Sequence, residues 1–303
     1  MEWTGTFAFP TVNELKHYPL KLSNNDNSCY ANVTLQATIH FGHSFFNRAM
    51  IEYRSHEPNA HDFATIYYKY ICDMVQGSNN SDSKTFRNYV ARFPSDQNQH
   101  YFLNGTQQDA YEFNSAFIKN LPRELKELFI FKQVLSKKCN CGAQSTQTTQ
   151  CRGIYLLLNT QQPITKFSES FDCFRNSQCE TCQQFTRQCF IFEYIFPEQC
   201  QFVILYTQLF TQGETRSKIA SKFSSYNIDH ISFPEVNYTR PTIFKIISVV
   251  VRIGDRPTSG HYVIWCRNLT NETWVRISDT THRTYNKLPK DLGSIQLFYL
   301  KRI

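Results

Sequence analysis

The sequence lacks several patterns that define whole classes of protein. It has only 10 glycines and 11 prolines in 303 residues, too few for a collagen-like or linker-like chain. It has no run of about 18 uncharged apolar residues, so we expect no transmembrane helix and no membrane partner. The first 20 residues include Glu2, Glu14 and Lys16, where a secretory signal peptide needs an unbroken apolar stretch. We therefore expect a cytoplasmic or nuclear protein.

An excess of charge of one sign is also lacking. The 32 Lys and Arg residues and the 25 Asp and Glu residues leave a net charge of +7, scattered along the chain, which argues against a nucleic-acid partner. Aromatic residues are abundant at 15%, and apolar residues reach 41%, so the chain is not disordered. Without an export signal, we expect the 11 cysteines to be reduced and to act as core residues, metal ligands or a nucleophile.

The period of the hydrophobic pattern changes near Phe131. Before it, helical spacing predicts helices from Cys29 to about Phe46, from Asp62 to Val75 and from Gln107 to Leu121, with a short helical segment after Pro122. After it, short apolar runs between turn signals predict strands at 153–158, 188–196, 202–206, 243–251, 261–267, 274–277 and 295–300. Helices first and antiparallel strands later favour an α+β fold, and the absence of a linker predicts a single domain over 1–303.

One cysteine and one histidine are candidates for a nucleophile and its base. Cys29 lies at the expected start of a helix, after the turn-forming residues 24–28. At that position the aligned peptide dipoles lower the pKa of a thiol and favour the thiolate. His261 begins an apolar strand, and the fold must bring it to Cys29. The alternative is a cysteine buried in the core and a histidine on the surface.

Three segments carry a family resemblance. Residues 22–36 match a cysteine motif at Asn24, Asn27, Cys29, Tyr30, Asn32, Leu35 and Gln36. Residues 107–113 match a Q-Q-D-A-x-E-F motif at every fixed position. Residues 259–263, followed by 274–279, are similar to a histidine motif. In this order, the three segments resemble the ubiquitin-specific proteases over most of the chain.

The resemblance implies a papain-like cysteine protease fold of fingers, palm and thumb. It implies a helical thumb over about residues 22–135, fingers with the clustered cysteines over about 136–200, and a palm over about 200–303. The implied activity is thiol-dependent hydrolysis of the peptide or isopeptide bond after the C-terminal glycine of ubiquitin. Ubiquitin or ubiquitinated proteins would be the partners, and no catalytic cofactor would be needed.

The same resemblance assigns roles to five residues. Cys29 would attack the carbonyl carbon, and His261 would take the thiol proton and return one to the leaving amine. Asn24 would donate a hydrogen bond to the oxyanion, the alternative being an ordinary turn residue. Gln107 and Asp109 would contact the bound ubiquitin tail. Their alternative is a polar helix start that caps its own amides.

The third triad position departs from the family pattern. It holds Ser278, and the next residue is Asp279. A hydroxyl can orient an imidazole but contributes no charge, whereas a carboxylate does both. We expect Ser278 to orient His261 and keep Asp279 as the second choice.

Other departures affect the surroundings of the reacting atoms. Asp26 replaces a glycine that often supports a positive φ, and its carboxylate would raise the pKa of the Cys29 thiol if it pointed that way. Arg252 stands in place of a usual histidine, and Ile277 in place of an aromatic residue. Together these departures leave open a catalytically weak or inactive scaffold that keeps the protease fold and binds ubiquitin.

The pairs Cys139–Cys141 and Cys179–Cys182 resemble the zinc knuckles at the fingertips of many ubiquitin-specific proteases. Four thiolates would give a closed tetrahedral structural site. The first pair is one residue shorter than C-x-x-C, so the alternatives are a distorted knuckle, an empty remnant or four reduced thiols. Substitute ligands nearby in the sequence are Cys151, Cys173 and Cys189. A zinc-supported interaction protein with no ubiquitin role would require all three motif matches to be accidental.

Overall fold

The structure is a computed structural model of the 303-residue chain. It describes residues 19–42, 45–50, 62–76, 81–92, 102–103, 105–156, 172–207, 229–236, 241–256, 259–268, 270–289, 292 and 294–303. Within these ranges no helix combines the length and the apolar character needed to cross a bilayer.

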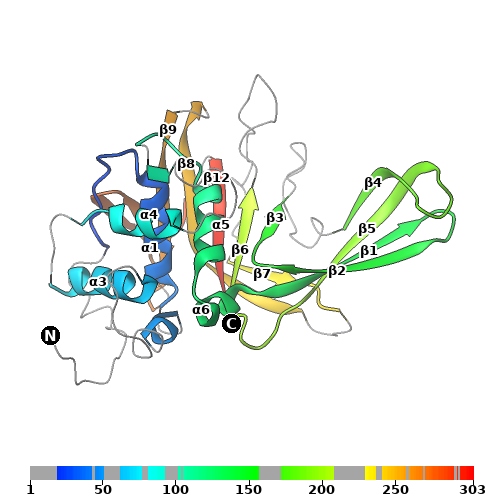
Figure 1. The fold of residues 1–303 in the computed structure, drawn as a ribbon, viewed down its shortest axis with the longest axis horizontal. Coiled ribbons are helices and arrows are strands. Elements are labelled where there is room, and N and C mark those ends of the chain that lie inside the picture. Colours follow the sequence, from blue (N-terminus) through cyan, green and yellow to red (C-terminus); the bar gives the residue numbers. More distant parts are fainter. Residues whose placement is uncertain are drawn as a thin grey trace.

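The helices come first in the chain and gather at one end of the molecule (Figure 1). They are α1 (Cys29–His40), α3 (Phe63–Gln76), α4 (Lys84–Ala91), α5 (Ala110–Asn120) and α6 (Arg123–Lys126), with a 3-10 turn, η2 (Glu127–Phe129), after α6. Helix α1 packs against α4 and α5 on one side and against the strands β8 (Thr242–Arg256) and β9 (Ser259–Arg267) on the other. It is therefore enclosed by other elements.

The strands form two sheets. A four-stranded antiparallel sheet has the order β2-β1-β5-β4 and consists of β1 (Phe131–Cys139), β2 (Gln144–Cys151), β4 (Asp172–Gln178) and β5 (Phe185–Ile195). An eight-stranded sheet includes the path β11-β10-β9-β8-β12-β6-β3, with β7 paired to β8. Its further strands are β3 (Ile154–Leu156), β6 (Phe202–Thr207), β7 (His230–Phe233), β10 (Trp274–Ser278), β11 (Thr281–Tyr285) and β12 (Ser294–Arg302).

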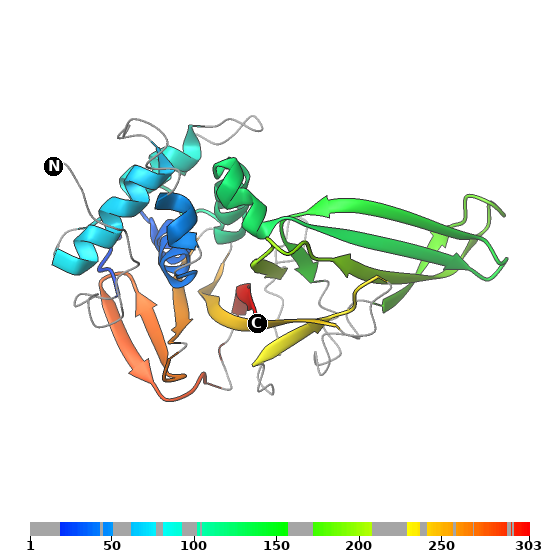
Figure 2. The ribbon, with the colours of Figure 1, turned by 90° about the horizontal axis from the view of Figure 1, so that it is seen from below.

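The two sheets play different parts in the architecture. The helices cover one face of the eight-stranded sheet, and the four-stranded sheet extends away from them at the far end of the molecule (Figure 2). One hydrophobic core joins α1 to the helices and the near face of the large sheet. A second core packs β8, β9 and β12 against the base of the four-stranded sheet. This arrangement confirms the expected α+β fold with an N-terminal helical part and a C-terminal part rich in antiparallel strands.

Some elements differ from the sequence-based expectation. The expected helix from Cys29 to about Phe46 is two helical segments, because α1 ends at His40 and the chain turns at Gly42, whose φ is +72°, before helix resumes at 45–50. Helix α4 and strands β1, β2, β4, β7 and β11 were not predicted. Strand β2 is polar and almost wholly exposed, so it lacks the alternation that marks a half-buried strand.

The aromatic cluster around Phe41 generates a prediction about stability. The Phe41 ring lies 4.6 Å from the ring of Phe202, 5.4 Å from that of Phe129 and 5.7 Å from that of Tyr299, and it is fully buried. Phe41→Ala should lower the free energy of unfolding by about 3–5 kcal/mol through lost burial and the cavity left behind. Thermal denaturation measures the effect. Phe185→Ala, at a side chain that is 72% exposed, is the matched control and should leave the melting temperature nearly unchanged.

Candidate active site

Cys29 is the first residue of α1, and its side chain is buried. Ser28 occupies the N-cap position, but its side chain makes no capping hydrogen bond. The preceding turn is instead held by a contact outside the helix, in which the Asn27 side chain donates to the Gly105 carbonyl at 2.8 Å. Asn27 has a φ of +52°, in the left-handed region that side chains rarely adopt. The turn therefore presents Cys29 through a locally strained backbone.

The thiol of Cys29 is contacted by polar groups from two other elements. The amide nitrogen of Gln107 lies 3.5 Å from Sγ, and the backbone of Tyr262, the residue after His261, also hydrogen-bonds to the thiol. Burial raises the pKa of the Cys29 thiol above its ordinary value, while the bonds from Gln107 and Tyr262 lower it. The negative charge of Asp279 adds to the increase. The expectation of a lowered pKa at the helix start is therefore wrong for this state, because desolvation outweighs the favourable contacts.

His261 lies on β9 and is held from strand β10. Its Nε2 atom lies 2.8 Å from the hydroxyl oxygen of Ser278 and 3.7 Å from a carboxylate oxygen of Asp279. Ser278 is thus at hydrogen-bonding distance, whereas Asp279 supplies a nearby charge. The two residues that the sequence left as alternatives both face the same imidazole nitrogen.

The carboxylate of Asp279 is itself held by the start of the chain. Asn32, on α1, donates its side-chain amide to Asp279 Oδ1 at 2.8 Å, and the Asn24 side chain also hydrogen-bonds to this carboxylate. Burial raises the pKa of Asp279, while the bond from Asn32, the His261 charge and the bond from Asn24 oppose the increase. Asp279 has a φ of +51°, a second strained position at the site. The sequence assigned no role to Asn32, although it matched the cysteine motif there.

Asn24 lies beside Asp279, and its Oδ1 atom is buried without a hydrogen-bond partner in the described part of the chain. Its amide nitrogen carries two N–H groups. When one of them donates to Asp279, the other is able to donate to an oxyanion. The structure thus places the Asn24 side chain against Asp279, which faces His261.

Asp26 does not disturb the thiol in the way that its position suggested. Its carboxylate forms an ion pair with Arg87 of α4 at 2.9 Å, and the Arg87 side chain is only 5% exposed. The positive φ in this loop occurs at the next residue, Asn27, and not at Asp26. Asp26, which replaces the glycine of the family pattern, therefore binds the buried guanidinium of Arg87. The sequence analysis did not identify Arg87.

Asp109 is the N-cap of α5. Its Oδ1 atom accepts hydrogen bonds from the backbone amides of Tyr111 at 2.7 Å and Glu112 at 3.2 Å. The side-chain amide of Gln296, on β12, donates to both carboxylate oxygens at 2.8 Å. Capping of the helix start, the alternative reading of this residue, is thus present, and Gln107 lies two residues before the cap.

The four clustered cysteines meet at the tip of the four-stranded sheet. The Sγ atoms of Cys139, Cys141, Cys179 and Cys182 all lie within 4.8 Å of one another. Two of these distances are 4.0 Å, between Cys139 and Cys182, and 3.8 Å, between Cys141 and Cys179. A tetrahedral ion with Zn–S bonds of about 2.3 Å holds its sulfur atoms roughly 3.8 Å apart. The donor set and its spacing therefore fit a closed tetrahedral metal site.

The shorter first knuckle reaches the same geometry as the second. Each cysteine pair is followed directly by a residue with positive φ: Gly142, at +90°, follows Cys141, and Gln183, at +58°, follows Cys182. The proposed substitutes are less suitable. Cys151 pairs with Phe131 at the opposite end of the sheet, Cys189 is not among the clustered sulfur atoms, and the side chain of Cys173 lies outside the described residues.

The site thus combines a buried cysteine at a helix start, which contacts the backbone of the residue after a histidine, with a hydroxyl and a carboxylate that face this histidine. This arrangement is typical of a papain-like cysteine protease. The sequence profile of the family described as ubiquitin carboxyl-terminal hydrolase matches residues 20–299. The chain therefore belongs to the ubiquitin carboxyl-terminal hydrolase family.

One curated relative is ubiquitin carboxyl-terminal hydrolase 48 of Danio rerio. It is 24% identical to this chain over 297 residues, which cover 85% of this chain and 26% of the relative. The chain thus spans about a quarter of the length of that protein.

The fold is similar to solved structures of one assembly. A chain of the SAGA DUB module Ubp8/Sgf11/Sus1/Sgf73 bound to monoubiquitin has a TM-score of 0.75 and 17% identity, with 99% of this chain and 72% of that chain covered. A chain of the same module bound to ubiquitin aldehyde has a TM-score of 0.73 and 16% identity, with 97% and 71% covered. At these identities, the likeness establishes the papain-like fold of this chain.

The contact between Gln107 and Cys29 generates a prediction about pH. Because the Gln107 amide lowers the thiol pKa, Gln107→Ala should raise it further and slow alkylation of Cys29 by iodoacetamide several-fold at neutral pH. In both proteins the rate should rise with pH, since the thiolate is the reactive form. Peptide mass spectrometry at Cys29 measures the rate. Gln108→Ala is the matched control, because the Gln108 side chain donates to Thr106 instead; equal pH profiles for all three proteins would contradict the assignment.

Proposed function

We propose that this chain is a deubiquitinase that hydrolyses the peptide or isopeptide bond after the C-terminal glycine of ubiquitin. The observation that carries the proposal is the cluster at the start of α1, where Gln107 reaches the Cys29 thiol and Ser278 and Asp279 face His261. Membership of the ubiquitin carboxyl-terminal hydrolase family supports ubiquitin as the substrate. The fold neighbours bound to monoubiquitin and to ubiquitin aldehyde support it as well.

Cys29 is the proposed nucleophile and His261 the proposed base. With Nε2 of His261 directed at Ser278, Nδ1 is the nitrogen that can accept the thiol proton. The Cys29 sulfur then bonds to the glycine carbonyl carbon, and the lysine amine leaves with a proton from His261. Water hydrolyses the resulting thioester and releases the carboxylate of ubiquitin. Proton transfer to His261 offsets the burial that disfavours the free thiolate.

The surrounding amides and carboxylates have supporting roles. Asn24 is proposed to donate its amide to the oxyanion of the tetrahedral intermediate. Gln107, which lies beside the thiol, and Asp109, which caps α5, are proposed to contact the C-terminal residues of ubiquitin. Ser278 orients the imidazole, and the charge of Asp279 stabilises its protonated form.

The inactive scaffold is the weaker alternative. Two departures from the family pattern, Asp26 and Ser278, are the reasons to consider it. Asp26 pairs with Arg87, which removes its carboxylate from the thiol, and the Ser278 hydroxyl lies at hydrogen-bonding distance from His261. Neither departure removes a reacting atom.

The four cysteines at the tip of the four-stranded sheet are proposed to bind a zinc ion. Thiolates select Zn²⁺ among the common divalent cations, and the cluster matches tetrahedral spacing. The ion would supply structure and no chemistry, because all four ligand positions are taken by Cys139, Cys141, Cys179 and Cys182. We also propose a reducing compartment, the cytoplasm or the nucleus, since none of the ten described cysteines forms a disulfide.

The function is tested by hydrolysis of a fluorogenic amide at the C-terminus of ubiquitin. The chain should release the fluorophore, and Cys29→Ala should abolish release while leaving the affinity for ubiquitin within a few-fold. Continued turnover by Cys29→Ala would show that the nucleophile is misassigned. Affinity for ubiquitin without turnover by the unmodified chain would favour the scaffold.

The triad makes a second prediction. Ser278→Ala removes the hydrogen bond to His261 and should lower kcat at least ~10-fold, because a disoriented base loses part of the ~10²–10⁴-fold that general base catalysis contributes. Asp279→Asn keeps a similar shape, removes the charge and should lower kcat less. Thr284→Ala, on exposed strand β11, is the hydroxyl control. A larger loss from Asp279→Asn than from Ser278→Ala would reverse the two roles.

The metal site makes a third prediction. The purified chain should contain one zinc ion per molecule by elemental analysis, and Cys179→Ser should lose the ion and the thermal stability that it supplies. Cys151→Ser, at the far end of the same sheet, is the control and should retain the metal. Zinc-free protein with unchanged stability after treatment with a chelator would refute the assignment.

A further inference from the structure

Arg252 is a buried arginine next to the strand residues that lead into His261. It lies on β8, is 3% exposed, and is paired in register with Tyr262, while its neighbour Ile253 is paired with His261. Burial of a guanidinium is unfavourable unless its N–H groups find acceptors. The contacts of Arg252 therefore indicate what this residue holds in place.

The guanidinium of Arg252 binds the turn between β8 and β9. Nη1 donates to the Tyr262 hydroxyl at 2.9 Å, and Nη2 donates to the carbonyl of Arg256 at 2.9 Å and lies 3.5 Å from that of Ser259. The charge also lies over the Tyr262 ring, 5.0 Å from its centroid. One side chain thus bridges both ends of the turn that precedes His261.

The described residue Gly260, which follows the turn, packs closely against β8 and Arg252. A Cβ atom added at Gly260 would lie 2.7 Å from the Ile253 carbonyl oxygen and 3.1 Å from Nη2 of Arg252. The backbone before His261 therefore rests directly on β8 and on the guanidinium. A shorter or uncharged side chain at position 252 would remove the hydrogen bonds that the guanidinium donates and its packing against Gly260.

Tyr262 extends the contact to the opposite side of the site. Its hydroxyl, bound by Arg252, also hydrogen-bonds to the backbone of Ala110, the first residue of α5. Asp109 caps that helix, and Gln107 just before it reaches the Cys29 thiol. The series Arg252, Tyr262 and Ala110 therefore joins the two segments that face Cys29.

We infer that Arg252 is a positioning residue that fixes the backbone before His261 and, through Tyr262, the start of α5. It thereby sets the positions of His261 and Gln107 relative to Cys29. The inference rests on the proposed function. Lysine cannot replace this arrangement, because a single ammonium cannot reach the hydroxyl and two carbonyls in the geometry of a planar fork.

The test compares Arg252→Met with Tyr262→Phe, which removes one oxygen atom and keeps the ring. Both variants should lower kcat for the ubiquitin amide about 10- to 100-fold, since small displacements of reacting groups have effects of this size. Affinity for ubiquitin, measured in the Cys29→Ala background, should change less than threefold. Tyr262→Phe keeps the test decisive if Arg252→Met fails to fold.

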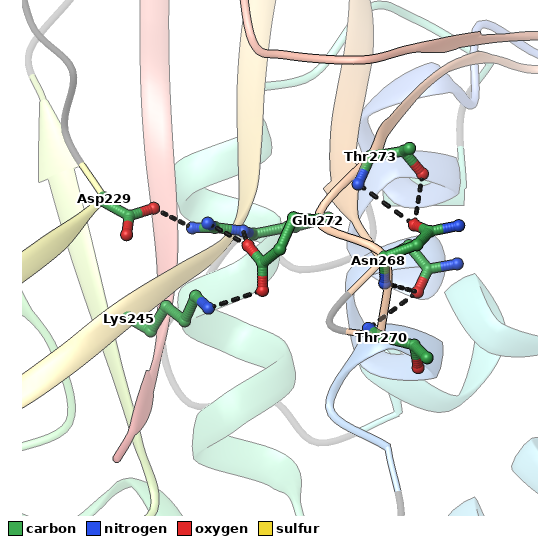
Figure 3. A network of polar contacts seen from close by, with 8 residues as sticks. Asp229, Lys245, Asn268, Thr270, Glu272 and Thr273 are labelled. Carbon is green, nitrogen blue, oxygen red and sulfur yellow. Dashed lines mark hydrogen bonds and ion pairs between the residues drawn. The ribbon is translucent and has the colours of Figure 1, made fainter.

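Arg267→Met is the matched control. Arg267 is also a buried arginine over an aromatic ring, 5.6 Å from the centroid of Trp274, and it forms ion pairs with Asp229 and Glu272 at the other end of β9. Figure 3 shows Asp229 and Glu272 in this network, with Lys245 donating to Glu272 at 2.8 Å. Arg267→Met should lower thermal stability while leaving kcat within about twofold.

The outcomes separate this inference from the proposed function. If the unmodified chain hydrolyses the ubiquitin amide and both site variants keep its kcat, or lose no more than Arg267→Met does, the role of Arg252 is refuted. If the unmodified chain does not act on ubiquitin, the proposed function fails. The rate of Cys29 alkylation by iodoacetamide then still tests the positioning, with a several-fold decrease expected in both site variants and unchanged rates overturning it.

Discussion

Burial of helix α1 is the interaction on which the catalytic arrangement depends. Eleven of its twelve residues are buried, and it packs against α4 and α5 on one side and β8 and β9 on the other. This packing brings Cys29, from the start of the chain, to the strand that carries His261. The same burial places the thiol in a low-dielectric environment that raises its pKa, so the reactive state depends on neighbouring donors and on proton transfer to the histidine.

Polar side chains inside the site balance that burial. Asn32 and Asn24 bind the Asp279 carboxylate, Arg87 binds Asp26, and Asp109 receives donors from α5 and from Gln296. Burial of a polar group is unfavourable unless it is paired, so the buried members of these contacts, Asn32 and Arg87, hold Asp279 and Asp26 in place. The two strained residues near the reacting groups, Asn27 and Asp279, are tolerated because these contacts determine the backbone around them.

The sequence predicts the parts of the molecule whose signal is local. Strand β6 was expected at 202–206 and lies at Phe202–Thr207, because its continuous apolar run is typical of a buried strand. The motifs likewise brought Cys29, His261 and Ser278 to attention. Strand β2 was not predicted, because both of its faces are polar. The roles of Arg87 and Gln296 were not predicted either. They come from tertiary contacts with residues 61 and 187 positions away, Asp26 and Asp109, for which one sequence contains no signal.

The proposed function requires that this fold recognises ubiquitin and presents an activated Cys29 to its C-terminus. The most direct test is to incubate the chain with ubiquitin that carries a thiol-reactive group at its C-terminus, and to measure the intact mass. A single adduct is expected on the unmodified chain and none on Cys29→Ser. No adduct on the unmodified chain, or the same adduct on Cys29→Ser, would contradict the proposed function.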